Sequence, residues 1–289
     1  MTGNAPIGVF DSGVGGLSVA RQFLRILPNE ELLYFADTAH VPYGGRPLDE
    51  VRGFALPICD FLVANGAKMV VMACNISSAV ALDAARLQHP DIPIIGVIAP
   101  GVQAALRQGA RRIGVLATQG TVSSGAYTAT AHRLDPTVNV VENACPRFVP
   151  LVEDGLSESA DAIDAARTYL EPLSRASCDT IILGCTHYPF LINALTREAG
   201  DLFPADHQPR FVDPAGETVR EAGVILADRA IAAPPSATPH HRYCTSGERA
   251  KFARQGPIFL GGPADDVIHV DLDSQERSYS LARLGRGVG

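Results

Sequence analysis

Two short apolar runs, each ending just before a cysteine, constrain the fold of this chain more than any other feature. The first run, 68–73, precedes Cys74, and the second, 179–184, precedes Cys185. Both are rich in aliphatic residues and are followed by polar ones, a pattern typical of strands buried on both faces of a parallel sheet. Because ligands of open α/β sheets bind beyond the carboxyl ends of the strands, we expect each thiol to lie at a ligand-binding edge.

Strand-like and helix-like segments alternate along the chain, which predicts a mostly parallel α/β fold. The segment 7–12, Ile-Gly-Val-Phe-Asp-Ser, resembles 113–118, Ile-Gly-Val-Leu-Ala-Thr. From Ile7 to Cys74 is 74 − 7 = 67 positions, and from Ile113 to Cys185 is 185 − 113 = 72. Two openings that are followed by a cysteine at similar distances indicate a duplicated α/β unit.

The expected elements follow from the hydrophobic periodicity and from the positions of glycine and proline. The expected strands are 6–10, 31–36, 68–73, 92–98, 112–117, 138–143, 180–184 and 211–212, with further short strands at 241–244, 258–260 and 267–272. The expected helices are 17–27, 48–65, 77–88, 123–134, 160–176, one within 188–199, and 216–232.

Composition is that of a globular protein, since 46% of the 289 residues are hydrophobic and 19% are charged. The formal net charge is −7 and no basic run occurs, which argues against a nucleic-acid partner. No apolar run approaches the roughly 18 residues of a membrane span, so we expect no membrane partner. The first residues lack the basic segment of a signal peptide, and we expect a cytoplasmic protein.

Cysteine and lysine usage bears on cofactors. Six cysteines without a Cys-x-x-Cys pair indicate no disulfide framework, and Cys185 with His187 has no second ligand pair at zinc-finger spacing. Pyridoxal chemistry needs a Schiff-base lysine. The only lysines are Lys68, at the amino end of a predicted strand, and Lys251, in a segment without a phosphate-binding motif. We therefore predict neither a metal nor an organic cofactor.

The loop after the first predicted strand, 11–16, reads Asp-Ser-Gly-Val-Gly-Gly and leads into a helix. It matches neither the dinucleotide fingerprint nor the Walker pattern, although backbone amides at a helix start can bind a carboxylate. Asp11 disfavours a phosphate and can pair with an ammonium group. A plain tight turn is the alternative interpretation.

Two further loops carry candidate binding groups. Tyr43 and Gly44 lie in a glycine-containing loop whose amides can approach an anion closely, although a surface turn explains the pattern equally well. Thr118 and Thr121 stand at a predicted helix start, where hydroxyls either cap the helix or bind a carboxylate.

Two candidates could move protons beside a thiol. His187 follows Cys185 by two positions, and a histidine there can lower the thiol pKa or shuttle its proton. Glu153 is a carboxylate in an apolar setting, with a solvated loop acid as the alternative. Two thiols that flank one substrate have the arrangement needed to invert a carbon centre.

With these motifs in place, the chain resembles the glutamate racemases of the cofactor-independent aspartate/glutamate racemase superfamily. The resemblance spans nearly the whole sequence and rests on several short motifs. These are Phe-Asp-Ser-Gly-Val-Gly-Gly-Leu at 10–17, Pro-Tyr-Gly at 42–44, Ala-Cys-Asn at 73–75, Pro-Leu-Val-Glu at 150–153, Gly-Cys-Thr-His-Tyr-Pro at 184–189, and Arg-Tyr-Cys-Thr-Ser-Gly at 242–247 with Phe-Leu-Gly at 259–261.

The resemblance implies two pseudo-symmetric, doubly wound parallel-sheet domains that face each other across the active site. The first would comprise 1–98 and 207–289, and the second 99–206. It further implies a homodimer that racemises L- and D-glutamate and supplies D-glutamate for peptidoglycan precursors. The implied catalytic residues are Cys74, Cys185, Asp11, His187 and Glu153, with Cys185 deprotonating L-glutamate and Cys74 deprotonating D-glutamate. The implied substrate-binding residues are Asp11, Ser12, Tyr43, Gly44, Asn75, Ile76, Thr118, Thr121 and Thr186.

One position departs from the family pattern. The family usually has Cys-Asn-Thr-Ala where this chain has Cys-Asn-Ile-Ser at 74–77, so Ile76 lacks the expected hydroxyl and Ser77 or Ser78 is the residue that could replace it. Two other interpretations remain open at this point. An aspartate racemase would share the two cysteines, whereas a non-enzymatic two-domain binding protein would not need them.

Overall fold

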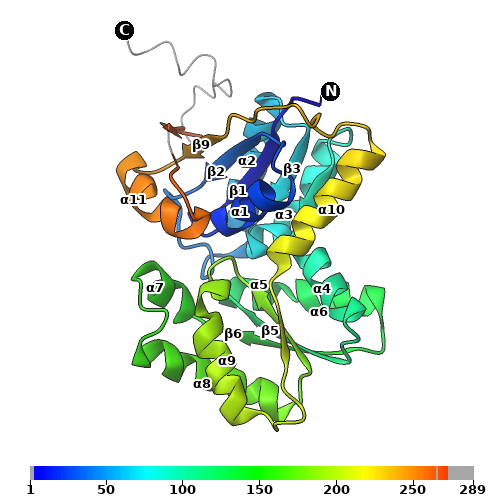
Figure 1. Cartoon of the computed structure of the whole chain (residues 1–289), viewed down its shortest axis with the longest axis vertical. Helices are drawn as coiled ribbons and strands as arrows, with labels where there is room; N and C mark the ends of the chain where they lie inside the picture. The colour runs from blue at the N-terminus through cyan, green and yellow to red at the C-terminus, as the bar shows by residue number, and fades with distance from the viewer. Residues whose placement is uncertain (1–2, 265, 273–289) are drawn as a thin grey trace. The chain divides into compact units, whose positions relative to one another are not determined.

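The computed structural model describes residues 3–264 and 266–272, which form two compact units (Figure 1). The first unit contains 3–43, 47–96 and the described residues from 219 onward, and the second contains 44–46 and 97–218. The second unit thus extends past the expected boundary at 206, because the strand at 210–212 pairs within its sheet. Residues 273–289 of the expected first domain lie outside the described residues.

The first unit is built on a six-stranded parallel sheet in the order β10-β9-β2-β1-β3-β4. Four of its strands are β1 (Ile7–Asp11), β2 (Leu32–Ala36), β3 (Met69–Met72) and β4 (Ile94–Gly96). The other two are β9 (Arg242–Thr245) and β10 (Val267–His269). All residues of β1, β2 and β3 are buried, as their continuous apolar runs predict for strands covered on both faces.

Helices cover both faces of this sheet (Figure 1). On one face α2 (Leu48–Ala64) and α3 (Asn75–Gln88) pack together, and Phe35 of β2 contacts Phe61 of α2 with ring centroids 5.3 Å apart. On the other face α1 (Leu17–Ile26) packs against α11 (Arg249–Leu260), and Phe252 of α11 contacts Tyr34 of β2.

The second unit is built on a four-stranded parallel sheet in the order β6-β5-β7-β8. Its strands are β5 (Arg112–Ala117), β6 (Asn139–Ala144), β7 (Thr180–Gly184) and β8 (Arg210–Val212). Its helices are α4 (Ile98–Arg107), α5 (Gln119–Ser124), α6 (Ala126–Leu134), α7 (Phe148–Glu153), α8 (Ala160–Arg175) and α9 (Ile192–Leu202), and α10 (Pro214–Asp228) follows β8.

Two glycines of this sheet let helices approach from opposite sides. A Cβ at Gly114 of β5 would lie 2.8 Å from Leu173 of α8, and a Cβ at Gly184 of β7 would lie 3.1 Å from Tyr127 of α6. Gly184 pairs with Ala117, which lies three positions after Gly114 on β5. Because successive side chains along a strand point to alternate faces, the two glycines face opposite sides of the sheet. The second unit is therefore also covered by helices on both faces.

The two sheets repeat one plan. The order β2-β1-β3-β4 in the first unit corresponds to β6-β5-β7-β8 in the second. Met69 of β3 pairs with Ile7, and Thr180 of β7 pairs with Ile113, the residues that open the repeated Ile-Gly-Val. These pairings confirm the predicted fold class of two pseudo-symmetric parallel α/β units.

Some elements differ from the sequence-based prediction. The strand expected at 258–260 is wrong, because these residues are the last turn of α11. Helix α11 as a whole was not expected, and neither were α4 and α7. The latter two carry a proline inside or near the first turn, Pro100 in α4 and Pro150 in α7, where a proline costs little because the early N–H groups have no partner inside the helix.

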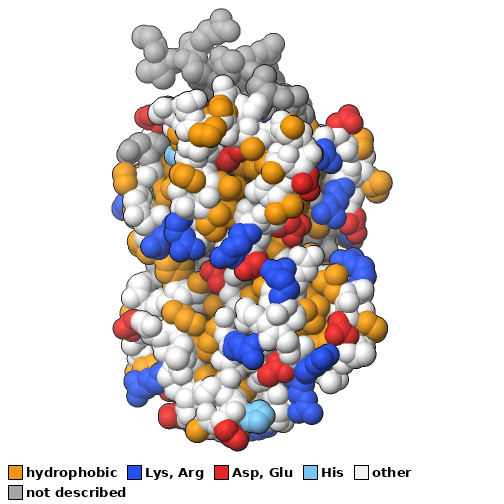
Figure 2. Space-filling view, turned by 45° about the vertical axis from the view of Figure 1, so that its right-hand side comes forward, with side chains coloured by type: hydrophobic (Ala, Val, Ile, Leu, Met, Phe, Trp, Pro, Cys, Tyr) orange, Lys and Arg blue, Asp and Glu red, His pale blue; other side chains and the backbone are white. Residues whose placement is uncertain are grey.

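The surface carries mixed charge. On the face shown in Figure 2, basic and acidic side chains lie interspersed and do not gather into a patch of one sign. Among the described residues, no helix is both long enough and apolar enough to cross a membrane.

Candidate active site

The Cys74 end of the first sheet gathers three chain segments. Asp11 is the last residue of β1, and Ala73, just after β3, donates its amide to Phe10 O at 2.8 Å. Cys74 is the N-cap of α3, so its thiol lies where the helix dipole favours negative charge. Ser12 and Asn75, two expected substrate-binding residues, are the chain neighbours of Asp11 and Cys74.

The glycine loop encloses the Asp11 side chain. Asp11 is 1% exposed, and its Oδ2 accepts hydrogen bonds from Gly13 N at 3.2 Å and Gly16 N at 3.0 Å. A Cβ at Gly16 would lie 2.4 Å from Asp11 Cβ and 2.8 Å from the Tyr34 hydroxyl, so only glycine fits there. The loop amides therefore hold a carboxylate of this chain, which explains the loop sequence without a phosphate.

Burial controls the charge of Cys74. Burial, and after it the negative charge of Asp11, raise the pKa of the Cys74 thiol to about 12. Hydrogen bonding from Ser77 and from the backbone amide of Ser12 acts in the opposite direction. The Cys74 side chain is therefore a neutral thiol at pH 7.

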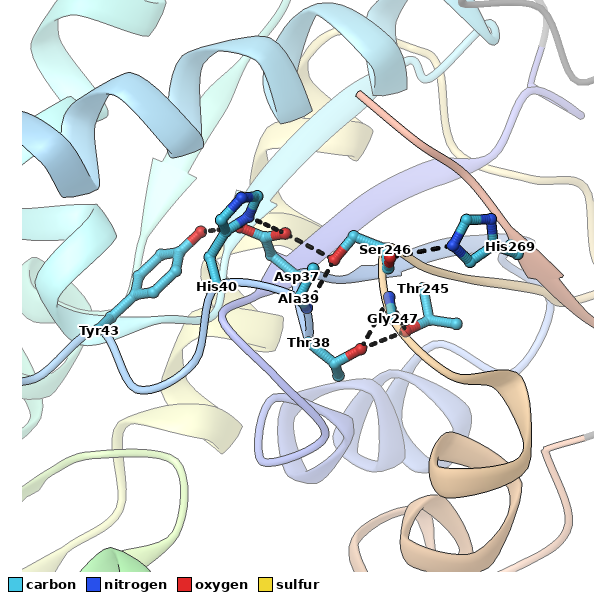
Figure 3. A network of polar contacts seen from close by, with 9 residues as sticks. All are labelled: Asp37, Thr38, Ala39, His40, Tyr43, Thr245, Ser246, Gly247 and His269. Carbon is cyan, nitrogen blue, oxygen red and sulfur yellow. Dashed lines mark hydrogen bonds and ion pairs between the residues drawn. The ribbon is translucent and has the colours of Figure 1, made fainter. Parts of the chain in front are cut away.

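Tyr43 is held by a buried carboxylate that follows β2 (Figure 3). The carboxylate of Asp37, 3% exposed, accepts hydrogen bonds from the Tyr43 hydroxyl and from Ser246 Oγ, the latter at 2.7 Å. His40 Nδ1 lies 2.9 Å from both Asp37 oxygens. Burial and the neighbouring Asp37 raise the pKa of the Tyr43 hydroxyl, so the phenol stays protonated. The Tyr43 hydroxyl therefore serves as a hydrogen-bond donor to Asp37.

The same network joins the loop after β2 to the segment after β9. Thr38 Oγ1 lies 2.6 Å from Thr245 Oγ1, and Gly247 N donates to Thr38 Oγ1 at 3.1 Å. Ala39 N donates to the Ser246 hydroxyl at 3.0 Å. The loop that carries Tyr43 is therefore fixed by a segment two hundred residues away in sequence (Figure 3).

An apolar cluster surrounds the Cys74 thiol. Tyr43, Val51, Cys74 and Ile76 pack together, with Phe54 against them. Ile76, which was expected to bind substrate, is 3% exposed and belongs to this cluster. The cluster keeps water from the sulfur, which is the physical cause of its raised pKa.

The Cys185 end of the second sheet holds a line of three groups. Cys185 Sγ lies 3.8 Å from His187 Nδ1, and His187 Nε2 lies 3.2 Å from Glu153 Oε1. Cys185 and His187 are buried, whereas the Glu153 side chain is 36% exposed. Thr186 Oγ1 also lies 3.4 Å from His187 Nδ1. A proton can pass along this line from the sulfur through the imidazole to a carboxylate in reach of solvent.

Two expected threonines and one glycine meet at the start of α5. Thr118 is the N-cap of α5, and its Oγ1 lies 3.1 Å from Oγ1 of the buried Thr121. Gly44 O accepts a hydrogen bond from Gly120 N at 2.8 Å, and a Cβ at Gly44 would lie 3.0 Å from Thr118. Glycine is required at position 44 by this close approach.

The two cysteines occupy equivalent places in the two sheets. Cys74 lies 74 − 69 = 5 residues after Met69, and Cys185 lies 185 − 180 = 5 residues after Thr180. Met69 and Thr180 both pair with the first residue of the repeated Ile-Gly-Val. The different spacings of 67 and 72 residues therefore reflect only the segments between the strands.

Two features of the described residues bear on metal and lysine chemistry. No group of three or more His, Cys, Asp or Glu among them is arranged to hold a metal ion. Lys68 is fully buried, with its Nζ 2.6 Å from Glu30 Oε2 and 2.5 Å from Gly3 O, at the amino end of β3.

Sequence reasoning missed Asp37. A signal is present in the sequence, since Asp37 directly follows the buried strand β2, and Asp11 is the last residue of the buried strand β1. The role of Asp37 became visible only through Tyr43 and Ser246, which are distant in sequence or separated by a loop.

The chain is similar to known proteins over nearly all of its length. The family model described as Asp/Glu/Hydantoin racemase matches residues 7–222. The glutamate racemase of Geobacter metallireducens is 43% identical over 273 residues, covering 93% of this chain and 98% of that protein.

The fold is also similar to solved structures of glutamate racemases. Glutamate racemase from Francisella tularensis, in complex with D-glutamate, has a TM-score of 0.87 at 31% identity and covers 94% of this chain and 99% of its own. Glutamate racemase from Thermus thermophilus, in complex with beta-chloro-D-alanine, has a TM-score of 0.82 at 40% identity, with coverage of 94% and 99%. The chain therefore belongs to the Asp/Glu/hydantoin racemase family and, within it, to the glutamate racemases.

Proposed function

We propose that this chain interconverts L- and D-glutamate by a two-base transfer of the Cα proton, without a metal or an organic cofactor. Inversion requires a base on one face of Cα and an acid on the other, and Cys74 and Cys185 are assigned to these faces. The observation that carries the proposal is the equal register of the two cysteines in two repeated sheets.

The electrostatics of the first unit favour one starting state. Cys74, with its pKa raised to about 12, begins as the thiol that donates a proton. We assign removal of the Cα proton of L-glutamate to Cys185. This state converts L-glutamate to D-glutamate. For the reverse reaction Cys74 must ionise. A substrate ammonium group near Asp11 would place a positive charge close to the sulfur and would lower the pKa of Cys74.

On the other side, His187 and Glu153 handle the proton that Cys185 removes. The imidazole lies between the sulfur and the carboxylate, and each step is within or near hydrogen-bond reach. Glu153 Oε1 lies beside His187 Nε2, on the side of the imidazole away from the sulfur, so we assign Glu153 the role of orienting and polarising the imidazole.

The polar groups at both strand ends are assigned to the substrate. Asp11 pairs with the α-ammonium group, and the Tyr43 and Gly44 amides help hold the side-chain carboxylate. The remaining substrate contacts are assigned to Ser12, Asn75, Ile76, Thr118, Thr121 and Thr186.

The setting of the reaction follows from its product. D-glutamate is required for peptidoglycan precursors, and we place the enzyme in the cytoplasm as a homodimer. Six unpaired cysteines in the described residues fit a reducing compartment.

The proposal is tested by incubating the purified, dialysed protein with L-glutamate and EDTA and by following D-glutamate on a chiral column. We expect turnover with glutamate, little with aspartate, and none in either Cys74→Ser or Cys185→Ser. Loss of turnover on chelation with recovery on adding a metal, or normal turnover in a folded single-cysteine variant, would contradict it.

A further inference from the structure

The first turn of α3 carries two adjacent buried serines whose hydroxyls differ. Ser78 Oγ donates to Met72 O at 2.8 Å. Ser77 is 0% exposed, yet within the described residues its Oγ has no hydrogen-bond partner of ordinary geometry. A buried hydroxyl without such a partner loses its hydration and gains nothing in return, so its presence calls for a functional reason.

The group beside Ser77 is the Cys74 sulfur. Cys74 is the N-cap of α3 and Ser77 is the third residue of the helix, and side chains at these two positions lie next to each other. A hydroxyl donor there, together with the Ser77 and Ser12 amides, favours the ionised form of the thiol. A neutral thiol is a weak hydrogen-bond acceptor, so a hydrogen bond from the Ser77 hydroxyl contributes little stability while Cys74 carries its proton. A thiolate accepts a charge-assisted hydrogen bond, which is shorter and stronger.

We propose that the Ser77 hydroxyl is a donor dedicated to the Cys74 thiolate, which it hydrogen-bonds once Cys74 has given up its proton. The inference rests on the proposed function in that Cys74 must act as a base in one direction. No proton leaves Ser77, because its O–H only turns toward the sulfur.

The local sequence supports this assignment. The resembled family pattern has threonine and alanine where this chain has Ile76 and Ser77. Ile76 packs in the apolar cluster with Tyr43 and Cys74, so the hydroxyl at this turn is carried by the next residue. The neighbouring Ser78 is occupied by its bond to Met72 O.

The other ionisable groups around the sulfur are Asp11 on β1, Tyr34 on β2 and Tyr43 before α2. The Asp11 carboxylate raises the pKa of Cys74. The pKa values of both phenols are raised, by burial first and also by the nearby charges of Cys74 and Asp11, so they remain neutral near pH 8. None of these groups donates in place of Ser77 when the thiolate forms, since the Tyr34 hydroxyl donates to Gly13 O and the Tyr43 hydroxyl to Asp37.

The test compares Ser77→Ala with Ser78→Ala in the full-length protein. Each is treated with iodoacetamide at pH 8, and the alkylation rates of Cys74 and Cys185 are read separately by peptide mass spectrometry. In Ser77→Ala we expect the pKa of Cys74 to rise by about one unit, which lowers the thiolate fraction and the Cys74 rate about tenfold. The Cys185 rate in the same sample stays unchanged.

Stability should change in the opposite sense for the two serines. Ser77→Ala removes a hydroxyl without an ordinary partner, so its Tm stays equal or rises, while kcat/KM falls about tenfold in both directions. Ser78→Ala loses the bond to Met72 O, so its Tm falls while the Cys74 alkylation rate is unchanged.

An unchanged Cys74 alkylation rate in folded Ser77→Ala would overturn the inference. An equal slowing in both serine variants would overturn it as well, because the cause would then be the packing of α3. The alkylation rates do not depend on turnover. Absence of racemisation in the wild-type protein would therefore contradict the proposed function while the Ser77 result is still decided by the Cys74 rate.

Discussion

At the scale of single residues, the proposed mechanism depends on what surrounds two buried thiols. Cys74 meets a carboxylate, an apolar cluster and two amides, whereas Cys185 meets an imidazole that contacts a partly exposed carboxylate. The two thiols therefore have different environments despite equivalent places in the repeated sheets. In the proposed mechanism one sulfur begins each reaction as acid and the other as base, and the two exchange roles in the reverse direction.

The line from Cys185 to Glu153 predicts graded losses. His187→Asn removes the group next to the sulfur and should lower kcat by about 10²–10³-fold, in the range typical of general acid–base groups. Glu153→Gln keeps the shape but removes the charge that acts through the imidazole, so kcat should fall by only about tenfold. Steady-state kinetics from both enantiomers measure this. A larger loss for Glu153→Gln than for His187→Asn would contradict the order of the line.

The sequence predicted most of the candidate residues, because each follows a recognisable strand or opens a helix. Asp11, Cys74, Thr118 and Cys185 all stand at strand ends that the hydrophobic pattern located. It could not show that Asp37 binds Tyr43, or which serine lies beside the sulfur. These facts depend on side-chain directions and on contacts between segments far apart in sequence.

At the scale of elements, the strand β2 has a buried carboxylate near each end, and we expect the two to contribute differently to stability and to substrate binding. Glu30, 5% exposed, precedes its amino end and pairs with Lys68, and Asp37, 3% exposed, follows its carboxyl end and holds Tyr43. Both are buried carboxylates with partners. Only the one at the carboxyl end lies at the edge where the site residues gather.

Asp37 and Tyr43 should act as a unit in substrate binding. Asp37→Asn and Tyr43→Phe should each raise KM for both enantiomers by about tenfold, because each releases the loop that leads to Gly44. Since the two groups share one hydrogen bond, the double variant should be little worse than either single variant. Glu30→Gln is the matched control, and it should lower stability while leaving KM unchanged. If the effects of the two single substitutions on KM add in the double variant, Asp37 and Tyr43 do not act as a unit.

The buried ion pair between Lys68 and Glu30 should contribute to the stability of the first unit. Lys68→Met leaves Glu30 buried with its opposite charge removed, which should lower the free energy of unfolding by about 3–5 kcal/mol. Adding Glu30→Gln should recover part of that loss. Urea denaturation measures both values. A drop below about 1 kcal/mol in Lys68→Met would show that the buried pair contributes little.

Element prediction failed where proline and short apolar runs misled it. Residues 258–260 are aliphatic and aromatic like a strand, but they complete a helix that packs on α1 and contains Pro257. The helix α4 begins at Ile98, the last residue of the expected strand 92–98, whereas the observed strand β4 ends at Gly96. Tertiary packing decides such short segments, since their local periodicity fits either structure.

At the scale of the whole molecule, the repeat visible in the sequence is a repeat of sheet order and register. Duplication explains why one chain offers two strand-end thiols. Cys178 and Cys244 are two further buried thiols of the described core.

These buried thiols predict a loss of stability at alkaline pH. Burial raises the pKa of Cys178 to about 11 and that of Cys74 and Cys244 to about 12, while a thiol in the unfolded chain has a pKa of about 8.5. Between these values the unfolded state binds fewer protons, so stability is complete below about pH 8.5 and falls as pH rises toward the folded-state pKa values. Denaturation midpoints from pH 7 to 11 should show this decline, and Cys244→Ala should make it shallower. A slope that Cys244→Ala leaves unaltered would rule out the ionisation of this thiol as a cause.

Two-base racemisation makes a specific demand on the hydrogen at Cα. When L-glutamate reacts in deuterated water and the reaction is stopped early, every D-glutamate formed should carry deuterium, because the second thiol has exchanged with solvent. The recovered L-glutamate should still carry hydrogen, and starting from D-glutamate should give the mirror result. D-glutamate that keeps the hydrogen of its substrate, or L-glutamate that takes up deuterium as fast as D-glutamate forms, would contradict the two-thiol account.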